Sequence, residues 1–196
     1  MTQLAVVLAA GGSRRFDAPD GASKLLASVG DTSLVRRCLD VAVAALAGPG
    51  IDEVAVVEGA VSLEGEVPPG VTRLANPRWS EGISTSLLVA VEHARAQGHD
   101  AVVVGLGDQP GIVTAAWRAV ARAPVTRPIA VATYKGGRAN PVRLPSSVWH
   151  LLPTDGDEGA RALMRDRPDL VQEVPCQGDP RDVDTQADLD AWLGDR

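Results

Sequence analysis

The stretch Leu4-Ala-Val-Val-Leu-Ala-Ala-Gly-Gly12 decides the fold, because two glycines end an unbroken apolar run. Such a run, without alternation of polar residues, is typical of a strand buried on both faces of a parallel sheet. A second run, Ala101-Val-Val-Val-Gly-Leu106, stops at the polar turn Gly107-Asp-Gln-Pro110. Parallel α/β sheets bind ligands outside the carboxyl ends of their strands, so we expect both loops at the edge of the sheet where a ligand binds.

Strands and helices alternate along the rest of the chain. Hydrophobic periodicity, together with capping residues and glycine stops, indicates helices at 33–47, 86–97, 114–123, 146–152, 158–166 and 185–193. Further strands are expected at 53–57, 71–74, 129–133, 141–144 and 170–174. This alternation predicts one domain over residues 1–196. Its expected fold is α/β, a three-layer α/β/α Rossmann-like arrangement with a mostly parallel central sheet.

Composition excludes several classes of function. Hydrophobic residues make up 45% of the 196 residues but aromatic residues only 3%, so the core must be built from Val, Leu, Ile and Ala. A net charge of -6 argues against nucleic acid as a partner. Cys38 and Cys176 form no metal-binding or disulfide pattern, which indicates reduced thiols and a cytoplasmic location. The apolar start of the chain is too short to cross a membrane, so no membrane partner is expected.

The first loop, from Leu8 through Phe16 and on to Lys24, carries the most chemical information. Glycines directly after a buried strand let backbone N–H groups approach an anion closely. Arg14 and Arg15 bring charge to a triphosphate, and Lys24 adds a mobile cation. The Gly-Lys-Ser/Thr of a P-loop and the GxGxxG of a dinucleotide site are both missing. A plain glycine turn with two solvated arginines is the alternative.

The chain resembles the MobA-like nucleotidyltransferases, and within them the molybdenum cofactor cytidylyltransferases. The first loop is similar to their L-x-A-G-G-x-S-x-R…K signature, although Phe16 replaces the usual Met and the stretch 17–23 is longer. Further segments resemble the family's motifs in the same order along the chain. They are Asn76–Leu87, Gly107–Pro110, Gly137–Val142, Gly156–Arg161 and Asp182–Thr185.

The resemblance implies magnesium-dependent transfer of a nucleoside monophosphate from an NTP to a phosphorylated acceptor, with pyrophosphate leaving. The implied catalytic residues are Lys24, Arg15 and Asp108. The implied nucleotide-binding residues are Leu8, Ala9, Ala10, Gly11, Gly12, Ser13, Arg14, Arg15, Lys24, Gly82, Ser86 and Asp108. The implied Mg²⁺ ligands are Asp108 and Asp184, and the implied acceptor-binding residues are Lys135, Arg138 and Asn140.

Several of these residues also have a purely structural interpretation. Asp108 fits an Asx-turn, and Asp182 competes with Asp184 for the metal. The hydroxyl residues at 84–86 could simply cap a helix. The glycines at 136 and 137 could form an ordinary turn, and Arg161 could be a surface charge.

Ala10 favours CTP over GTP, because the guanylyl members of the family have Gly at this position. The resemblance implies molybdopterin carrying molybdenum as the acceptor, and a molybdenum hydroxylase that receives the product. Three alternatives remain open. They are a guanylyltransferase for the same cofactor, a nucleotidyltransferase for another small phosphorylated acceptor, and a non-catalytic module that binds and delivers the cofactor.

Overall fold

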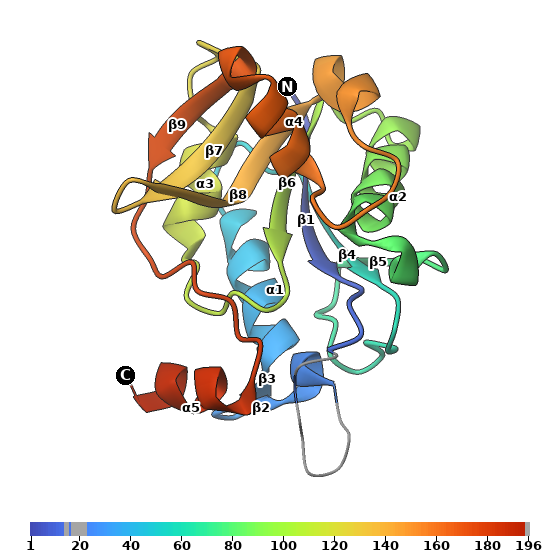
Figure 1. The fold of residues 1–196 in the computed structure, drawn as a ribbon, viewed down its shortest axis with the longest axis vertical. Coiled ribbons are helices and arrows are strands. Elements are labelled where there is room, and N and C mark those ends of the chain that lie inside the picture. The colour runs from blue at the N-terminus through green and yellow to red at the C-terminus, as the bar shows by residue number, and fades with distance from the viewer. Residues whose placement is uncertain (14–15, 17–22, 195–196) are drawn as a thin grey trace.

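A central seven-stranded sheet organises the computed structural model, which describes residues 1–13, 16 and 23–194 (Figure 1). The strand order is β5-β4-β1-β6-β8-β7-β9. The strands are β1 Gln3–Ala9, β4 Glu53–Glu58, β5 Thr72–Ala75, β6 Ala101–Leu106, β7 Ile129–Tyr134, β8 Gly137–Pro145 and β9 Val171–Pro175. All neighbours pair in parallel except β8, which is antiparallel to both β6 and β7. The predicted mostly parallel sheet is confirmed.

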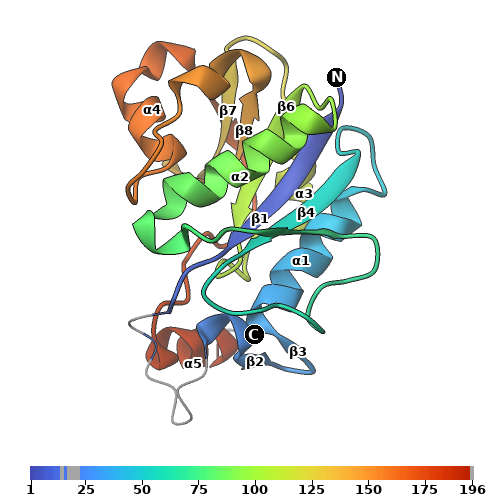
Figure 2. The same cartoon turned by 90° about the vertical axis from the view of Figure 1, so that its right-hand side faces the viewer.

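Helices cover both faces of this sheet, which confirms the three-layer arrangement. They are α1 Leu34–Ala45, α2 Ile83–Ala96, α3 Thr114–Ala121, α4 Ala160–Asp166 and α5 Gln186–Gly194. Figure 2 shows α2 crossing one face while α1 lies behind the sheet. Short 3-10 helices lie at η1 Lys24–Leu26, η2 Trp79–Glu81, η3 Ser146–Leu151 and η4 Pro168–Leu170, and a small hairpin pairs β2 Ser28–Val29 with β3 Thr32–Ser33.

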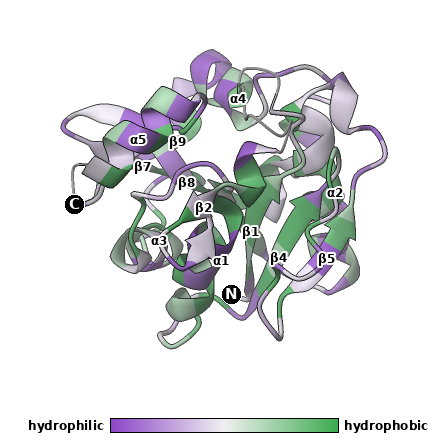
Figure 3. Ribbon diagram, turned by 90° about the horizontal axis from the view of Figure 1, so that it is seen from below, coloured by the Kyte–Doolittle hydropathy of each residue, from purple (hydrophilic) through white to green (hydrophobic). Residues whose placement is uncertain are grey.

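The core has one layer on each side of the sheet. Along β1, Ala5 and Val7 pack in the layer under α1 and α3, whereas Leu4 and Val6 pack in the layer under α2 and α4. Every residue of β1 is buried, as an uninterrupted apolar strand requires. Figure 3 shows the apolar character concentrated along the sheet strands.

The C-terminal helix α5 packs on the β2–β3 hairpin, beside the start of α1 (Figure 1). Trp192 and Leu189 of α5 join Phe16, Val29 and Leu34 in a third, small hydrophobic cluster. The guanidinium of Arg37 lies 5.2 Å from the centroid of the Trp192 ring, a cation–π distance. Helix α5 therefore packs in one cluster with Phe16, which follows β1 in the chain.

Several boundaries differ from the prediction. Helix α2 begins at Ile83, before the expected start at 86, because Gly82 and not a hydroxyl residue is its N-cap. Strand β8 extends over 137–145, well beyond the predicted 141–144. Its first residues are polar and partly exposed, so they carry no strand pattern. Ser33 caps α1, accepting a hydrogen bond from the Arg36 N–H at 3.2 Å.

No helix in the described residues is long and apolar enough to cross a membrane.

Candidate active site

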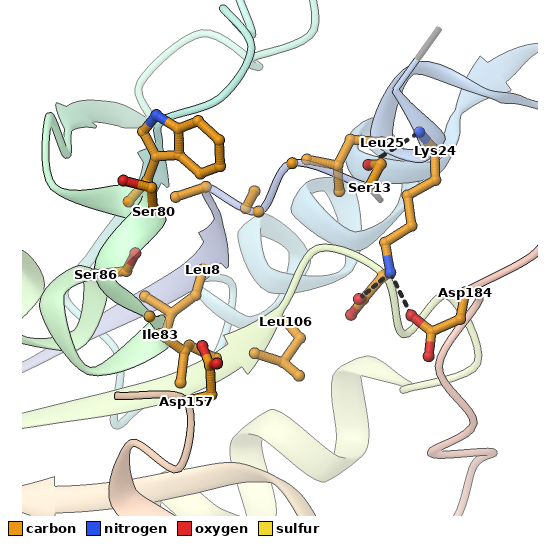
Figure 4. Close-up of a pocket in the computed structure, with 17 residues that line it drawn as sticks. Leu8, Ser13, Lys24, Leu25, Ser80, Ile83, Ser86, Leu106, Asp157 and Asp184 are labelled. Carbon is orange, nitrogen blue, oxygen red and sulfur yellow. Dashed lines mark hydrogen bonds and ion pairs between the residues drawn. The ribbon is translucent and has the colours of Figure 1, made fainter. Parts of the chain in front are cut away.

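A pocket of about 380 Å³ opens at the carboxyl ends of β1 and β6, the edge where the sequence predicts a ligand (Figure 4). The glycine turn after β1, the Lys24–Leu25 segment, the start of α2 and the turn after β6 form its walls. The predicted site residues that line it are Leu8, Ala9, Ala10, Gly11, Gly12, Ser13, Lys24, Gly82, Ser86, Asp108 and Asp184. Arg14 and Arg15 lie outside the described residues.

Hydrogen bonds within the first loop position the backbone of Lys24. The Ser13 hydroxyl accepts from the Lys24 N–H at 3.2 Å and lies 2.9 Å from the Ser23 hydroxyl. Ser23 in turn is the N-cap of η1, and Leu25 anchors this short helix in the core with 3% exposure. The lysine therefore projects from a fixed turn, although the stretch before it is longer than in the family pattern.

The Lys24 ammonium bridges two carboxylates that come from opposite parts of the chain. Its Nζ donates to Asp108 Oδ2 at 2.8 Å and to Asp184 Oδ1 at 2.7 Å (Figure 4). Burial alone would lower the pKa of Lys24, but attraction to Asp108 and the hydrogen bonds to both carboxylates raise it above its ordinary value. The lysine is therefore a cation at neutral pH and offsets the repulsion between the two aspartates.

Backbone contacts bring the two aspartates together. Gly107 allows the close approach of β6 to β1, since a Cβ there would lie 2.9 Å from the Cβ of Ala9. The carbonyl of Asp108 accepts from the Val183 N–H at 2.9 Å, which ties the C-terminal segment to the turn after β6. Next to Asp184, Thr185 and Asp188 exchange hydrogen bonds in a capping box at the start of α5. Thr185 is thus the N-cap of α5.

The carboxylate pair fits a divalent cation. Asp108 Oδ1 is buried and has no hydrogen-bond partner among the described residues, so one carboxylate oxygen of the pair is unused. The other Asp108 oxygen and Asp184 Oδ1 both face the point that the ammonium occupies. The described residues hold no group of three or more His, Cys, Asp or Glu side chains that could enclose a metal. A cation with few protein ligands that retains waters and binds substrate phosphates, such as Mg²⁺, suits two carboxylates.

The segment that leads into α2 forms the far wall of the pocket. Asn76, which is 2% exposed, donates from Nδ2 to Thr85 Oγ1 and to Ser86 Oγ, both at 2.9 Å. Gly82 has φ +113, and a Cβ there would lie 2.3 Å from the carbonyl oxygen of Gly156. The hydroxyls at 84–86 lie inside the first turn of α2 and do not cap it, so the capping interpretation is wrong.

Sequence reasoning assigned no binding role to several wall residues. Trp79, Ser80, Ile83, Leu106 and Asp157 also line the pocket. The Trp79 indole lies against the glycine turn, since a Cβ on Gly12 would lie 2.9 Å from its ring. A tryptophan next to a predicted nucleotide loop, in a chain with 3% aromatic residues, was the available signal. Asp157 lies in the segment Gly156–Arg161 that resembles a family motif, and contacts between residues distant in sequence bring its loop to the pocket.

The three residues predicted to bind the acceptor do not all line one cavity. Asn140 and Arg138 line an open groove beside the pocket. The Arg138 guanidinium forms a salt bridge with Glu173 at 2.8 Å. Lys135 lies in the turn between β7 and β8 with φ +49 and lines neither this groove nor the nucleotide pocket. Arg161, for which a plain surface charge was the alternative, borders this groove.

Asp182 hydrogen-bonds to Gln109, whereas Asp108 and Asp184 bind the Lys24 ammonium. The Oδ1 of Asp182 accepts from Gln109 Nε2 at 2.7 Å, and Gln109 Oε1 accepts from Asn140 Nδ2 at 3.1 Å. Burial and repulsion from Asp108 raise the pKa of Asp182 above its ordinary value. The geometry therefore pairs Asp184, and not Asp182, with Asp108 across Lys24.

A glycine turn after the first strand of a parallel sheet, facing a lysine and two carboxylates, is an arrangement of phosphate-binding α/β proteins. The chain belongs to the family of MobA-like NTP transferase domains, whose model matches residues 5–173. It is therefore placed among nucleotidyltransferases that act on nucleoside triphosphates.

Two relatives match along most of their length. The purine catabolism protein PucB of Bacillus subtilis (strain 168) is 30% identical over 202 residues, covering 95% of this chain and 94% of PucB. The nicotine blue oxidoreductase of Paenarthrobacter nicotinovorans is 32% identical over 196 residues, covering 92% of this chain and 91% of the relative.

Solved structures agree with the fold. Rv0371c from Mycobacterium tuberculosis H37Rv is 29% identical with a TM-score of 0.83, covering 98% of this chain and 97% of that one. A complex of Rv0371c with manganese has a TM-score of 0.75 and 27% identity, covering 99% of both chains. A nucleotidyl transferase from Methanothermobacter has a TM-score of 0.76 at 21% identity over 99% of both chains, which shows a shared fold.

Proposed function

We propose that the chain transfers CMP from CTP to a phosphorylated acceptor of the molybdopterin type, with Mg²⁺ as cofactor and pyrophosphate as product. The observation that carries this proposal is the Lys24–Asp108–Asp184 cluster at the mouth of the glycine turn. Both reactants are anions, so neutralising their charge and aligning them are the main tasks of such an enzyme. A cation-holding pair of carboxylates beside a lysine serves both tasks.

Each part of the pocket then has a role. The backbone of Gly11 and Gly12, with Ser13, binds the triphosphate, and Arg14 and Arg15 add positive charge to it. Lys24 neutralises the charge that develops at the α-phosphate. Asp108 and Asp184 would hold Mg²⁺, which would supply further positive charge to the phosphates. The manganese complex of Rv0371c supports a divalent cation in a related protein.

The base of the nucleotide lies against the start of α2. Ser86 offers its hydroxyl and Gly82 its backbone to the base edge, while Leu8 and Ala9 form the floor of the pocket. Ala10 follows β1, is 5% exposed and lines the pocket. Its methyl group takes up space that a glycine would leave open, and this favours cytosine over the larger guanine. A guanylyltransferase that uses GTP is the alternative for the same site.

The acceptor side of the proposal rests on the family. Asn140 and Arg138 border the groove next to the pocket, and Lys135 lies further along the same hairpin. We propose that these residues bind a molybdopterin-type acceptor and that a molybdenum hydroxylase receives the product. Another small phosphorylated acceptor would use the same charge-neutralising cluster.

The oxidoreductase of Paenarthrobacter nicotinovorans adds a second candidate, an oxidation–reduction reaction on a compound such as nicotine blue. Hydride transfer makes no use of two carboxylates bridged by a lysine, so the cluster favours nucleotidyl transfer. A module that only binds and delivers a cofactor has no use for the cluster either.

The test is pyrophosphate release with Mg²⁺ and molybdopterin, with CTP, GTP, ATP and UTP supplied one at a time. Release with CTP alone supports the cytidylyltransferase, and release with GTP alone moves the assignment to the guanylyl enzymes. Absence of release with every NTP would contradict transfer to this acceptor. Calorimetric titration of each NTP then separates a pure binding module, which binds without turnover, from an enzyme with another acceptor.

A further inference from the structure

Trp79 connects the two walls of the nucleotide pocket. It belongs to η2, directly before the start of α2, and Ser80 next to it lies on the same side of the pocket as Ser86 (Figure 4). Its indole extends from there to the glycine turn after β1. A Cβ on Gly12 would lie 2.9 Å from Cζ3 and 3.2 Å from Cη2 of this ring. The backbone of the turn therefore rests directly on the edge of the indole.

A second glycine gives the tryptophan room to reach the turn. Gly59 follows β4, and a Cβ there would lie 2.6 Å from the Cβ of Trp79 and 2.9 Å from the Cβ of Ala10. The Ala60 N–H donates to the Ala10 carbonyl at 3.0 Å, which holds this segment beside the end of β1. Gly12 itself does not have a positive φ, so lack of space beside the indole restricts this position and backbone strain does not.

Buried hydrogen bonds fix the segment that carries the indole. Asn76 accepts from the Arg78 N–H at its Oδ1 at 2.9 Å and donates from Nδ2 to Thr85 Oγ1, also at 2.9 Å. The Thr85 hydroxyl donates to the Arg78 carbonyl at 3.0 Å. Asn76 is 2% exposed and Thr85 3% exposed, so water does not compete for these bonds. Trp79 is thus held firmly against the first turn of α2.

The glycine turn, by contrast, has little else to hold it. Gly11 and Gly12 are exposed, and within the described part of the chain no hydrogen bond holds the backbone of either residue. Glycine backbone has more conformational freedom than that of any other residue, and a ligand that orders it loses binding free energy. A rigid surface behind the turn removes this cost before the ligand arrives.

We propose that Trp79 is a positioning residue that holds the backbone N–H groups of Gly11 and Gly12 in place for the triphosphate, in register with the base wall at the start of α2. The inference rests on the proposed function, because it concerns the NTP bound in the same pocket. It also predicts that positions 12 and 79 depend on each other. An alanine at 12 pushes the turn away from the indole, and this effect should vanish when the indole is removed.

Calorimetric titration with tripolyphosphate in the presence of Mg²⁺ tests the role of Trp79, because this probe has the charge of an NTP without its base. We expect Trp79→Leu to bind tripolyphosphate about tenfold more weakly, since the turn loses its support. Trp79→Phe keeps an aromatic ring and should recover most of the affinity. Gly12→Ala should weaken binding about tenfold in the wild-type background, but less than about twofold further in the Trp79→Leu background.

Two controls separate positioning from general damage. Gly59→Ala clashes with the Cβ of Trp79 and with Ala10, and both contacts persist in Trp79→Leu, so that background should not rescue it. Trp149 is buried at 6% exposure and does not line the pocket. Trp149→Leu should therefore lower the melting temperature without changing the affinity for tripolyphosphate.

Titration of the same proteins with CTP distinguishes failure of this inference from failure of the proposed function. Unchanged tripolyphosphate affinity in Trp79→Leu would overturn the inference, and so would an equal effect of Gly12→Ala in both backgrounds. A wild type that binds tripolyphosphate but not CTP would contradict the proposed use of CTP, while the comparison of the Trp79 variants would still decide the inference. A wild type that binds neither would overturn both.

Discussion

At the scale of single residues, Asp108 is the most important residue of the proposed reaction. One of its oxygens bonds to Lys24 and the other is buried without a partner among the described residues. We expect Asp108→Ala to lower kcat by about a hundredfold or more, in the range found when one electrostatic stabiliser is removed from an active site. Pyrophosphate release measures kcat, and a thermal melt confirms that the fold persists. The matched control is Asp190→Ala, an exposed carboxylate of α5, which should behave as the wild type. Unchanged turnover in Asp108→Ala would remove this residue from the site.

Glu53 links stability to pH at the other end of the sheet. Its carboxylate accepts hydrogen bonds from His93 at 2.8 Å and from His99 at 2.9 Å. Burial alone would raise the pKa of Glu53, but the hydrogen bonds from these histidines and from Thr72 hold it below the usual value. A lowered folded-state pKa stabilises the protein above the unfolded-state pKa, and this contribution is lost as pH falls through the folded-state pKa.

The corresponding prediction concerns Glu53→Gln. Its free energy of unfolding, from urea titrations, should lie below that of the wild type at pH 7, and the difference should shrink as the pH falls below about 4. Glu64→Gln changes an exposed carboxylate and is the control. A difference that is constant from pH 7 to acid would show that the ionised form of Glu53 is not what stabilises the fold.

At the scale of elements, the start of α2 depends on one glycine. Gly82 has φ +113 and almost touches the carbonyl of Gly156, so Gly82→Ala combines a strained backbone with a clash. We expect it to lower the free energy of unfolding by more than about 2 kcal/mol and to raise the KM for the nucleotide. Gly98→Ala isolates the backbone contribution, because Gly98 has φ +75 with nothing within 4 Å of its Cβ position, and it should cost about 1 kcal/mol. Equal losses in both variants would contradict the clash.

The same elements show what the sequence can and cannot predict. The strands β1 and β6 are predictable because burial on both faces leaves an unbroken apolar run. The position of Asp108 follows from the strand it ends. The start of β8 is not predictable, because Gly137 and Arg138 are exposed and their pairing with β7 comes from the hairpin. The position of Asp157 at the pocket is not predictable either. It depends on the hydrogen bond between Ser84 and Gly156, which lie far apart in sequence.

At the scale of the whole molecule, the site depends on both ends of the chain. The glycine turn and Lys24 come from the start, whereas Asp184 comes from the segment before α5, beyond the 5–173 match to the family model. Trp192, which is 6% exposed, anchors α5 in the cluster that contains Phe16. A hydrophobic cluster therefore connects α5 to the phosphate loop, in addition to the ion pair between Lys24 and Asp184.

This connection predicts the effect of Trp192→Ala. Loss of the anchor should displace Asp184 and lower kcat by about tenfold to a hundredfold, because small misplacements of catalytic groups are costly. Trp192→Phe keeps an aromatic ring and should recover most of the rate. Circular dichroism of both variants checks that the sheet is retained. A Trp192→Ala protein with full turnover would mean that α5 does not position Asp184.

The most direct test of the central claim is the dependence of nucleotidyl transfer on a metal at the carboxylate pair. The measurement is pyrophosphate release from CTP and molybdopterin by protein stripped with EDTA, before and after Mg²⁺ is restored. We predict no release without metal and full release after Mg²⁺ is added, with Asp108→Ala remaining inactive in both conditions. Release that persists without metal, or that Asp108→Ala shows at the wild-type rate, would contradict the account.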